Sequence, residues 1–197
     1  FGEEYTLVAC ADYVLSKNPG STVSNLSSTR ALRDITESRG LTYHASAVGE
    51  VNVVNAMKAT QAVIGGEGNG GIIFPESHYG RDALVGVALF LSLLAERKIA
   101  VSTLRAGYPS YFMSKKKIDL NPTIDVDAIL VAMESKYAHE QISTIDGVKI
   151  DFPNEWVHLR KSNTEPIIRI YTEAPTQKAA DNLGNKIINE IKEVAGI

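Results

Sequence analysis

The sequence has little of what marks a secreted, membrane-bound or nucleic-acid-binding protein. Cys10 is the single cysteine, which excludes an internal disulfide framework and fits a reducing cytoplasm. A formal net charge of −3 argues against a basic face for nucleic acid or a membrane surface, so any anion site must be local. The aromatic content of 7% also disfavours a base-stacking sheet. The chain opens on Phe1 without a signal-peptide pattern, which we interpret as a fragment or a processed product.

Long hydrophobic runs are also missing. The longest extends from Ala83 to Ala95 and is interrupted by Gly86 and Ser92. This run is too short to span a bilayer, and charged pairs border it on both sides, so it predicts a buried core helix.

The first half of the chain alternates helical and strand-like patterns. Apolar periodicity predicts helices over 4–17, 28–39, 51–59 and 82–97, and strands over 22–26, 41–48, 62–64 and 72–74. This alternation favours a layered α/β domain, with helices around a mixed, largely parallel sheet.

The pattern changes after the Gly- and Pro-containing segment 106–110, which predicts domains at 1–107 and 108–197. Strand-like segments follow at 111–120, 142–145, 148–152, 156–160 and 167–172, with helices at 125–137 and 177–194. Asp146-Gly147 is a hairpin signal, and Thr176 can cap the last helix. We expect a smaller α+β domain with an antiparallel sheet of the TATA-binding-protein-like type.

One polar segment, residues 160–169, lies between two strand-like stretches and combines two arginines with small hydroxyl and amide side chains. Guanidinium groups match phosphate oxygens, and a tight turn directs backbone N–H groups toward an anion. A polar hairpin tip with two incidental arginines has the same composition. Taken alone, the segment leaves both interpretations open.

A second unusual segment is the glycine-rich stretch 64–72. Only Glu67 and Asn69 carry side chains between Gly65 and Gly71, and both could hydrogen-bond to neighbouring sugar hydroxyls. The alternative is a flexible connector with a solvated Glu67. The stretch lacks the Lys-Ser/Thr of a nucleotide-binding loop.

Together, and in this order, the two segments resemble the third and fourth domains of the α-D-phosphohexomutases, the phosphoglucomutase, phosphomannomutase and phosphoglucosamine mutase superfamily. That family carries a Gly-Glu-x-Ser/Asn-Gly loop and a later Arg-x-Ser-Asn-Thr-x-Pro-x-x-Arg loop, and both patterns occur here. Ile73-Phe74-Pro75, Gly80-Arg81-Asp82 and the segment 111–115 are similar to a branch common among archaeal and some bacterial members. The resemblance covers essentially the whole chain.

The resemblance implies roles for specific residues. Glu67 and Asn69 would hold two adjacent sugar hydroxyls. The phosphate that is not being transferred would be bound by Arg160, Ser162, Asn163, Thr164 and Arg169. Family members interconvert hexose 6-phosphate and hexose 1-phosphate through an enzyme phosphoserine, a bisphosphorylated intermediate and Mg²⁺. The hexose, whether glucose, mannose or glucosamine, is left open.

The chain also departs from the family pattern. Many relatives have Ser at the position of Asn69 and His at the position of Gly71. The phosphoserine and magnesium loops belong to the family's first two domains, and nothing here matches them, so we expect no catalytic residue or metal ligand in this piece. It would be inactive without its N-terminal domains. The alternative is a free-standing, non-catalytic sugar-phosphate binding module.

The remaining titratable residues fit structural roles. Asp125 and Asp127 suit helix capping, while Lys161 and Glu165 are expected to face solvent. The four histidines have no ligand spacing with one another or with the cysteine: His44, His78, His139 and His158. Of these, His78 lies near the glycine-rich stretch, where we interpret it as a surface residue.

Overall fold

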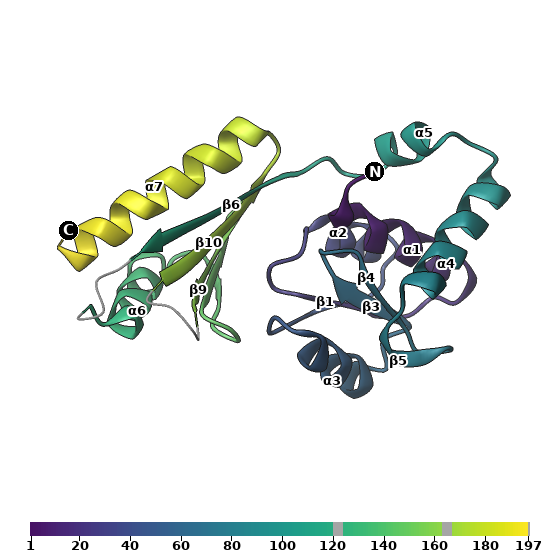
Figure 1. The fold of residues 1–197 in the computed structure, drawn as a ribbon, viewed down its shortest axis with the longest axis horizontal. Coiled ribbons are helices and arrows are strands. Elements are labelled where there is room, and N and C mark those ends of the chain that lie inside the picture. Colours follow the sequence, from purple (N-terminus) through teal and green to yellow (C-terminus); the bar gives the residue numbers. More distant parts are fainter. Residues whose placement is uncertain (120–123, 163–166, 197) are drawn as a thin grey trace. The chain divides into compact units, whose positions relative to one another are not determined.

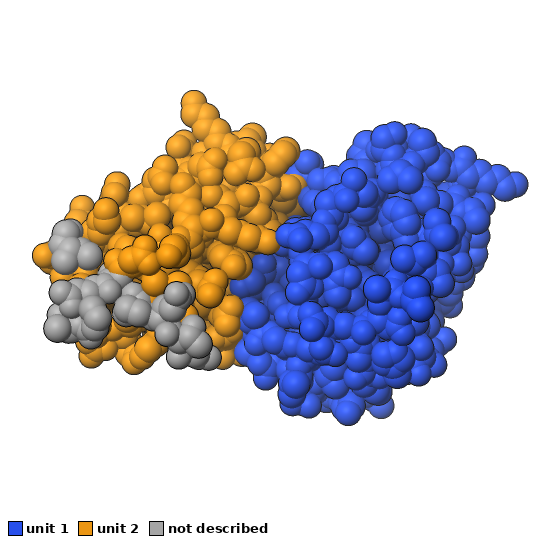
Figure 2. Space-filling model, in the orientation of Figure 1, with its two compact units in different colours: residues 1–110 blue, residues 111–197 orange. Residues whose placement is uncertain are grey.

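A computed structural model describes residues 1–119, 124–162 and 167–196. The chain divides into two compact units, residues 1–110 and 111–197, which Figure 2 colours separately. Each unit has its own sheet and its own helices (Figure 1). Within the described ranges, no helix has the length and apolar character needed to cross a membrane.

The first unit contains a five-stranded sheet in the order β2-β1-β3-β4-β5. Its strands are β1 Thr22–Asn25, β2 Tyr43–Ser46, β3 Ile64–Glu67, β4 Gly71–Phe74 and β5 His78–Arg81. β1 runs parallel to β2 and β3, whereas β3, β4 and β5 form antiparallel pairs. The predicted mixed α/β sheet is confirmed. Its parallel part ends at β3, because a short turn between β3 and β4 forces antiparallel pairing.

Helices pack on both faces of this sheet. They are α1 Glu3–Lys17, α2 Ala31–Glu37, α3 Glu50–Thr60 and α4 Ala83–Arg97, and the short helix α5 Val101–Ala106 follows them. Neighbouring residues of a strand point to opposite faces. A Cβ at Gly65 would lie 2.6 Å from Met57 Sδ of α3, and one at Gly66 would lie 3.3 Å from Leu7 Cδ1 of α1. β3 is therefore held between α1 and α3, as Figure 1 also shows.

The second unit contains an antiparallel sheet in the order β6-β10-β9-β8-β7. Its strands are β6 Phe112–Asp119, β7 Gln141–Ser143, β8 Val148–Asp151, β9 Trp156–Lys161 and β10 Ile167–Ala174. α6 Val126–Lys136 and α7 Gln177–Ala195 share one hydrophobic core with this sheet. The predicted antiparallel α+β domain is confirmed.

Local signals in the second unit act as predicted. The Thr176 side chain accepts a hydrogen bond from the Ala179 backbone N–H at 3.1 Å, which caps α7. Asp125 caps α6 through the backbone N–H groups of Asp127 and Ala128. Gly147, in the turn between β7 and β8, has a φ of +69°, which favours glycine.

Candidate functional site

The glycine-rich stretch is a β-hairpin rather than a continuous loop. β3 extends through Glu67 and β4 begins at Gly71, so only residues 68–70 form the turn. The strand expected at 62–64 therefore lies at Ile64–Glu67 instead. Glycine is needed inside the ladder because a Cβ at Gly66 would lie 1.9 Å from the Gly71 carbonyl oxygen. Gly70, in the turn, has a φ of +83°.

Glu67 is the last residue of β3 and is only 6% exposed. Its Oε1 accepts hydrogen bonds from Asn25 Nδ2 at 2.8 Å and from the Gly49 N–H at 3.2 Å. Its Oε2 lies 3.4 Å from Arg81 Nη1. The alternative of a solvated Glu67 is wrong. Because this Oε2 contact is the longest of the three and a carboxylate oxygen can accept two hydrogen bonds, Oε2 keeps capacity for a ligand hydroxyl.

Asn69 lies exposed in the hairpin turn. Its Oδ1 accepts a hydrogen bond from the Gly71 N–H at 3.0 Å, which is an Asx-type turn. The oxygen therefore stabilises the turn, and the two amide hydrogens are the part of this side chain suited to a ligand.

Polar residues outside the stretch support its geometry, and the sequence did not identify them. Ser28 Oγ accepts a hydrogen bond from the Gly68 N–H at 2.9 Å and donates one to Asn25 Oδ1 at 3.0 Å. The Glu4 carboxylate accepts from the Thr29 N–H at 3.0 Å. The available signal was topological, since residues that follow one parallel strand lie beside the end of its neighbour.

Arg81, the last residue of β5, connects two carboxylates. Its Nε donates to Glu50 Oε2 at 2.9 Å and its backbone N–H donates to Glu50 Oε1 at 3.0 Å. The backbone N–H and then the guanidinium lower the pKa of Glu50. A Cβ at Gly71 would lie 2.7 Å from Arg81 Cδ, so Arg81 occupies the space next to that glycine.

In the second unit, the pairing register brings together the two arginines of the polar segment. Arg160 on β9 lies directly opposite Arg169 on β10, and Arg169 lies opposite Lys117 on β6. Directly opposed residues share a face of the sheet. These three residues, Lys117, Arg169 and Arg160, form a cationic row across three strands. Arg160 Nε lies 3.0 Å from Asp146 Oδ2, which orients the guanidinium.

The rest of the polar segment is only partly described. Ser162 is 9% exposed, and its backbone N–H donates to the Ile167 carbonyl at 3.0 Å. Asn163 and Thr164 lie outside the described residues, as does Glu165. Lys161 Nζ forms an exposed ion pair with Asp127 Oδ2 at 2.7 Å.

The histidines hold no metal site in the described part of the chain. His158 is buried, which lowers its pKa to about 4, and its Nε2 lies 2.6 Å from the Asp146 carbonyl oxygen. That nitrogen therefore carries a hydrogen and donates it. His78 is exposed and pairs with Asp82 Oδ2 at 3.0 Å. Among the residues described, no group of three or more His, Cys, Asp or Glu could bind a metal. A magnesium site built from three or more such side chains is therefore absent from the described residues.

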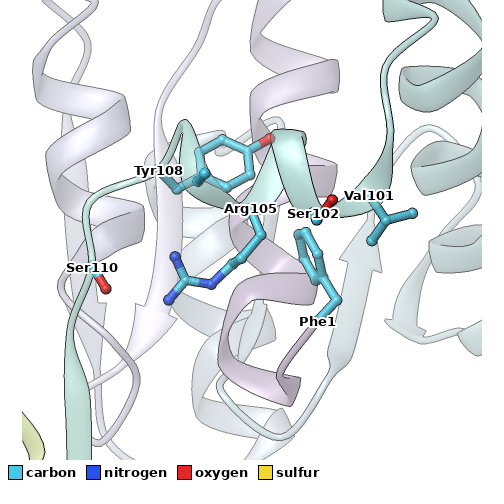
Figure 3. Close-up of a pocket in the computed structure, with 7 residues that line it drawn as sticks. Phe1, Val101, Ser102, Arg105, Tyr108 and Ser110 are labelled. Atoms are coloured by element: carbon cyan, nitrogen blue, oxygen red, sulfur yellow. The ribbon is translucent and has the colours of Figure 1, made fainter.

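Figure 3 shows a surface pocket in the first unit. Arg105 and Tyr108 line it together with Phe1, Val101, Ser102, Ala106 and Ser110. The Arg105 guanidinium lies 3.4 Å from the centre of the Tyr5 ring, which ties α5 to α1. None of the predicted sugar- or phosphate-binding residues lines this pocket.

The fold and these two sites define a class of two-domain protein: an α/β unit with a carboxylate at a glycine hairpin, followed by an antiparallel α+β unit with a cationic strand row. Residues 2–111 match the family described as phosphoglucomutase/phosphomannomutase, alpha/beta/alpha domain III. Residues 114–190 match the C-terminal domain of the same family. The chain belongs to the phosphoglucomutase/phosphomannomutase family, which confirms the resemblance.

Individual relatives agree with this membership. The phosphoglucosamine/phosphogalactosamine mutase of Sulfurisphaera tokodaii is 34% identical over 183 residues, covering 90% of this chain and 39% of that protein. The phosphoglucomutase/phosphomannomutase of Thermococcus kodakarensis is 34% identical, over an alignment that covers 94% of this chain and 41% of that protein. The crystal structure of a phosphoglucomutase/phosphomannomutase family protein from Burkholderia thailandensis is also similar, with a TM-score of 0.79 and 25% sequence identity. The match covers 97% of this chain and 41% of the Burkholderia chain. The chain thus spans about two-fifths of the length of these relatives.

Proposed function

We propose that this chain is the sugar- and phosphate-recognition part of a phosphosugar mutase that interconverts hexose 6-phosphate and hexose 1-phosphate. The observation that carries the proposal is the register that sets Arg160 opposite Arg169 in a unit that matches the family's C-terminal domain. Two guanidinium groups on one face can share the charge of a phosphate dianion. Ser162, Asn163 and Thr164 would complete this clamp with hydroxyl, amide and backbone donors.

The glycine hairpin supplies the complementary half of the recognition. Glu67 Oε2 would accept a hydrogen bond from one sugar hydroxyl, and the Asn69 amide would donate to its neighbour. The same pair of hydroxyls and one distal phosphate are presented by both the 1-phosphate and the 6-phosphate. Binding these common features positions either end of the sugar for phosphoryl transfer, without bond-making by this part of the protein.

The chemical steps belong to the rest of the protein in this proposal. The preceding domains would carry the phosphoserine and bind Mg²⁺, which in the family supplies electrostatic stabilisation of the transferring phosphoryl group. A bisphosphorylated hexose would be the intermediate, and the intact enzyme would work in the cytoplasm. Glucose, mannose and glucosamine phosphates are the candidate substrates. The 197-residue chain alone would bind hexose phosphate and would not turn it over.

Calorimetric titration with glucose 1-phosphate and with inorganic phosphate tests this proposal. Arg160→Ala should weaken the binding of both ligands by about ten- to a hundredfold, because charge-assisted hydrogen bonds are lost. Glu67→Ala should weaken only glucose 1-phosphate. Lys178→Ala, which removes an exposed charge from α7 in the same unit as Arg160, should change neither. If Arg160→Ala leaves the affinity for glucose 1-phosphate unchanged, the proposal is wrong.

A further inference from the structure

We propose that Arg81 is a positioning residue for sugar recognition, holding the Glu67 carboxylate in place from the space that Gly71 leaves open. This inference rests on the function proposed above and adds to it a residue from a third strand. Glu67 and Asn69 come from the hairpin itself, whereas Arg81 comes from β5 at the edge of the sheet.

The contacts of Arg81 fix its own position before it reaches Glu67. Its Nε and its backbone N–H both donate to the Glu50 carboxylate, at 2.9 and 3.0 Å. Two donors on one carboxylate define the direction of the side chain more closely than a single contact does. From this anchor, Nη1 lies 3.4 Å from Glu67 Oε2. The exposed fraction is 45% for the Arg81 side chain and 7% for that of Glu67, so a partly exposed arginine contacts an almost buried carboxylate.

Gly71 provides the room for this arrangement. A Cβ at position 71 would lie 2.7 Å from Arg81 Cδ and 3.0 Å from Asn69 Oδ1. Gly71 is not among the glycines with positive φ, so backbone conformation does not require glycine here. The close approach of the arginine does. Any larger residue would displace Arg81 from Glu67 and press on Asn69 at the same time.

The consequence for ligand binding follows from the two oxygens of Glu67. Oε1 is directed by Asn25 and by the Gly49 N–H. Oε2 has Arg81 as its partner, and at 3.4 Å this contact is longer than a well-formed hydrogen bond. Arg81 thus orients Oε2 by charge and leaves room for it to accept from a hydroxyl group. The ligand class that uses this oxygen is a hexose phosphate with adjacent free hydroxyls. Inorganic phosphate has no group for it.

Titration of three variants separates positioning from general stability. Arg81→Met keeps the length of the side chain without its charge and should weaken glucose 1-phosphate binding by about tenfold. Arg81→Lys keeps the charge and should recover part of this loss. Inorganic phosphate should bind all variants like the wild type. Lys17→Met, which breaks an exposed ion pair with Glu96 at the opposite end of α1 from Glu4, is the control and should bind both ligands normally.

A second set of variants tests the role of Gly71. Gly71→Ala should weaken glucose 1-phosphate binding because the methyl group displaces Arg81. In an Arg81→Ala background, which removes the Cγ and Cδ atoms that the methyl group meets and leaves only the Asn69 Oδ1 contact at 3.0 Å, the same alanine should cause a smaller additional loss. If Gly71→Ala weakens binding by the same factor in both backgrounds, the two residues act independently and the proposed link between them is wrong. Thermal unfolding of each variant shows whether the first unit is folded.

The outcomes distinguish this inference from the function on which it rests. If Arg160→Ala weakens glucose 1-phosphate binding while Arg81→Met binds it like the wild type, the Arg81 inference alone fails. The inference also fails if Arg81→Met weakens both ligands equally. If the wild type binds neither ligand, the proposed function fails and the Arg81 inference falls with it.

Discussion

At the scale of single residues, burial decides the chemistry of several polar side chains. Glu67 and His158 are both removed from solvent, but their partners differ. Glu67 has two neutral donors and an arginine. His158 has a backbone carbonyl, and the nearby Lys149 opposes protonation. Burial therefore leaves one group equipped to accept a hydroxyl and holds the other as a neutral structural donor.

The low pKa of His158 predicts a loss of stability in mild acid. The unfolded histidine titrates near its ordinary value of about 6.5, whereas the folded pKa is about 4. Between these values the unfolded state binds more protons, so stability falls as the pH decreases from about 6.5 to about 4 and is fully present above that range. The loss attributable to this residue is about 3 kcal/mol.

Urea unfolding at pH 7 and pH 4.5 measures this effect. Trp156, the single tryptophan of the chain, is fully buried beside His158 on β9, so its fluorescence reports the second unit. His158→Gln keeps an N–H donor and does not titrate. It should lose less stability between the two pH values than the wild type. An equal loss in both proteins would show that His158 does not carry the pH dependence.

At the scale of elements, the sequence predicted those segments whose apolar pattern is long or whose turn chemistry is distinctive. α7 follows this rule: its buried residues repeat at helical spacing after a threonine cap. β5 was missed because its residues are mostly exposed and show no alternation. α5 was missed because it is short, with Leu104 as its one buried residue. The position of β3 was predicted incorrectly because its glycines have the composition of a loop. In the structure these glycines let side chains of α1 and α3 pack closely against the strand.

The turn between β7 and β8 gives a prediction for a whole hairpin. Gly147 combines a φ of +69° with a Cβ position only 2.1 Å from the Leu159 carbonyl oxygen of β9. Gly147→Ala should destabilise the second unit by more than about 1 kcal/mol, because both the backbone conformation and the packing are lost. Tryptophan fluorescence in urea would measure this change.

Gly196 provides the matched control for that substitution. It also has a left-handed φ, of +70°, but nothing lies within 4 Å of its Cβ position. Gly196→Ala should therefore cost less than Gly147→Ala. Equal losses would mean that backbone conformation alone accounts for the glycine at 147.

At the scale of the whole molecule, a net charge of −3 coexists with a local row of cations on three strands. The two motifs were visible in the sequence because their composition is unusual. The residues that orient them were not, since Asn25, Arg81 and Asp146 contact these motifs only through the fold. A sequence pattern identifies the groups suited to a ligand, whereas the partners that direct those groups depend on the fold.

The cationic row and the proposed Mg²⁺ site in other domains predict how glucose 1-phosphate binding responds to salt and to EDTA. Because no group of three or more His, Cys, Asp or Glu among the described residues could hold a metal, removing Mg²⁺ with EDTA should leave the affinity of the 197-residue chain for glucose 1-phosphate unchanged. Raising the NaCl concentration from about 50 to about 500 mM, roughly a tenfold increase in ionic strength, should weaken this affinity. The reason is that salt screens the partly exposed cationic row. Calorimetry under matched buffers measures both effects. A loss of affinity on adding EDTA would place a metal in the recognition step itself and contradict the assignment of Mg²⁺ to the preceding domains.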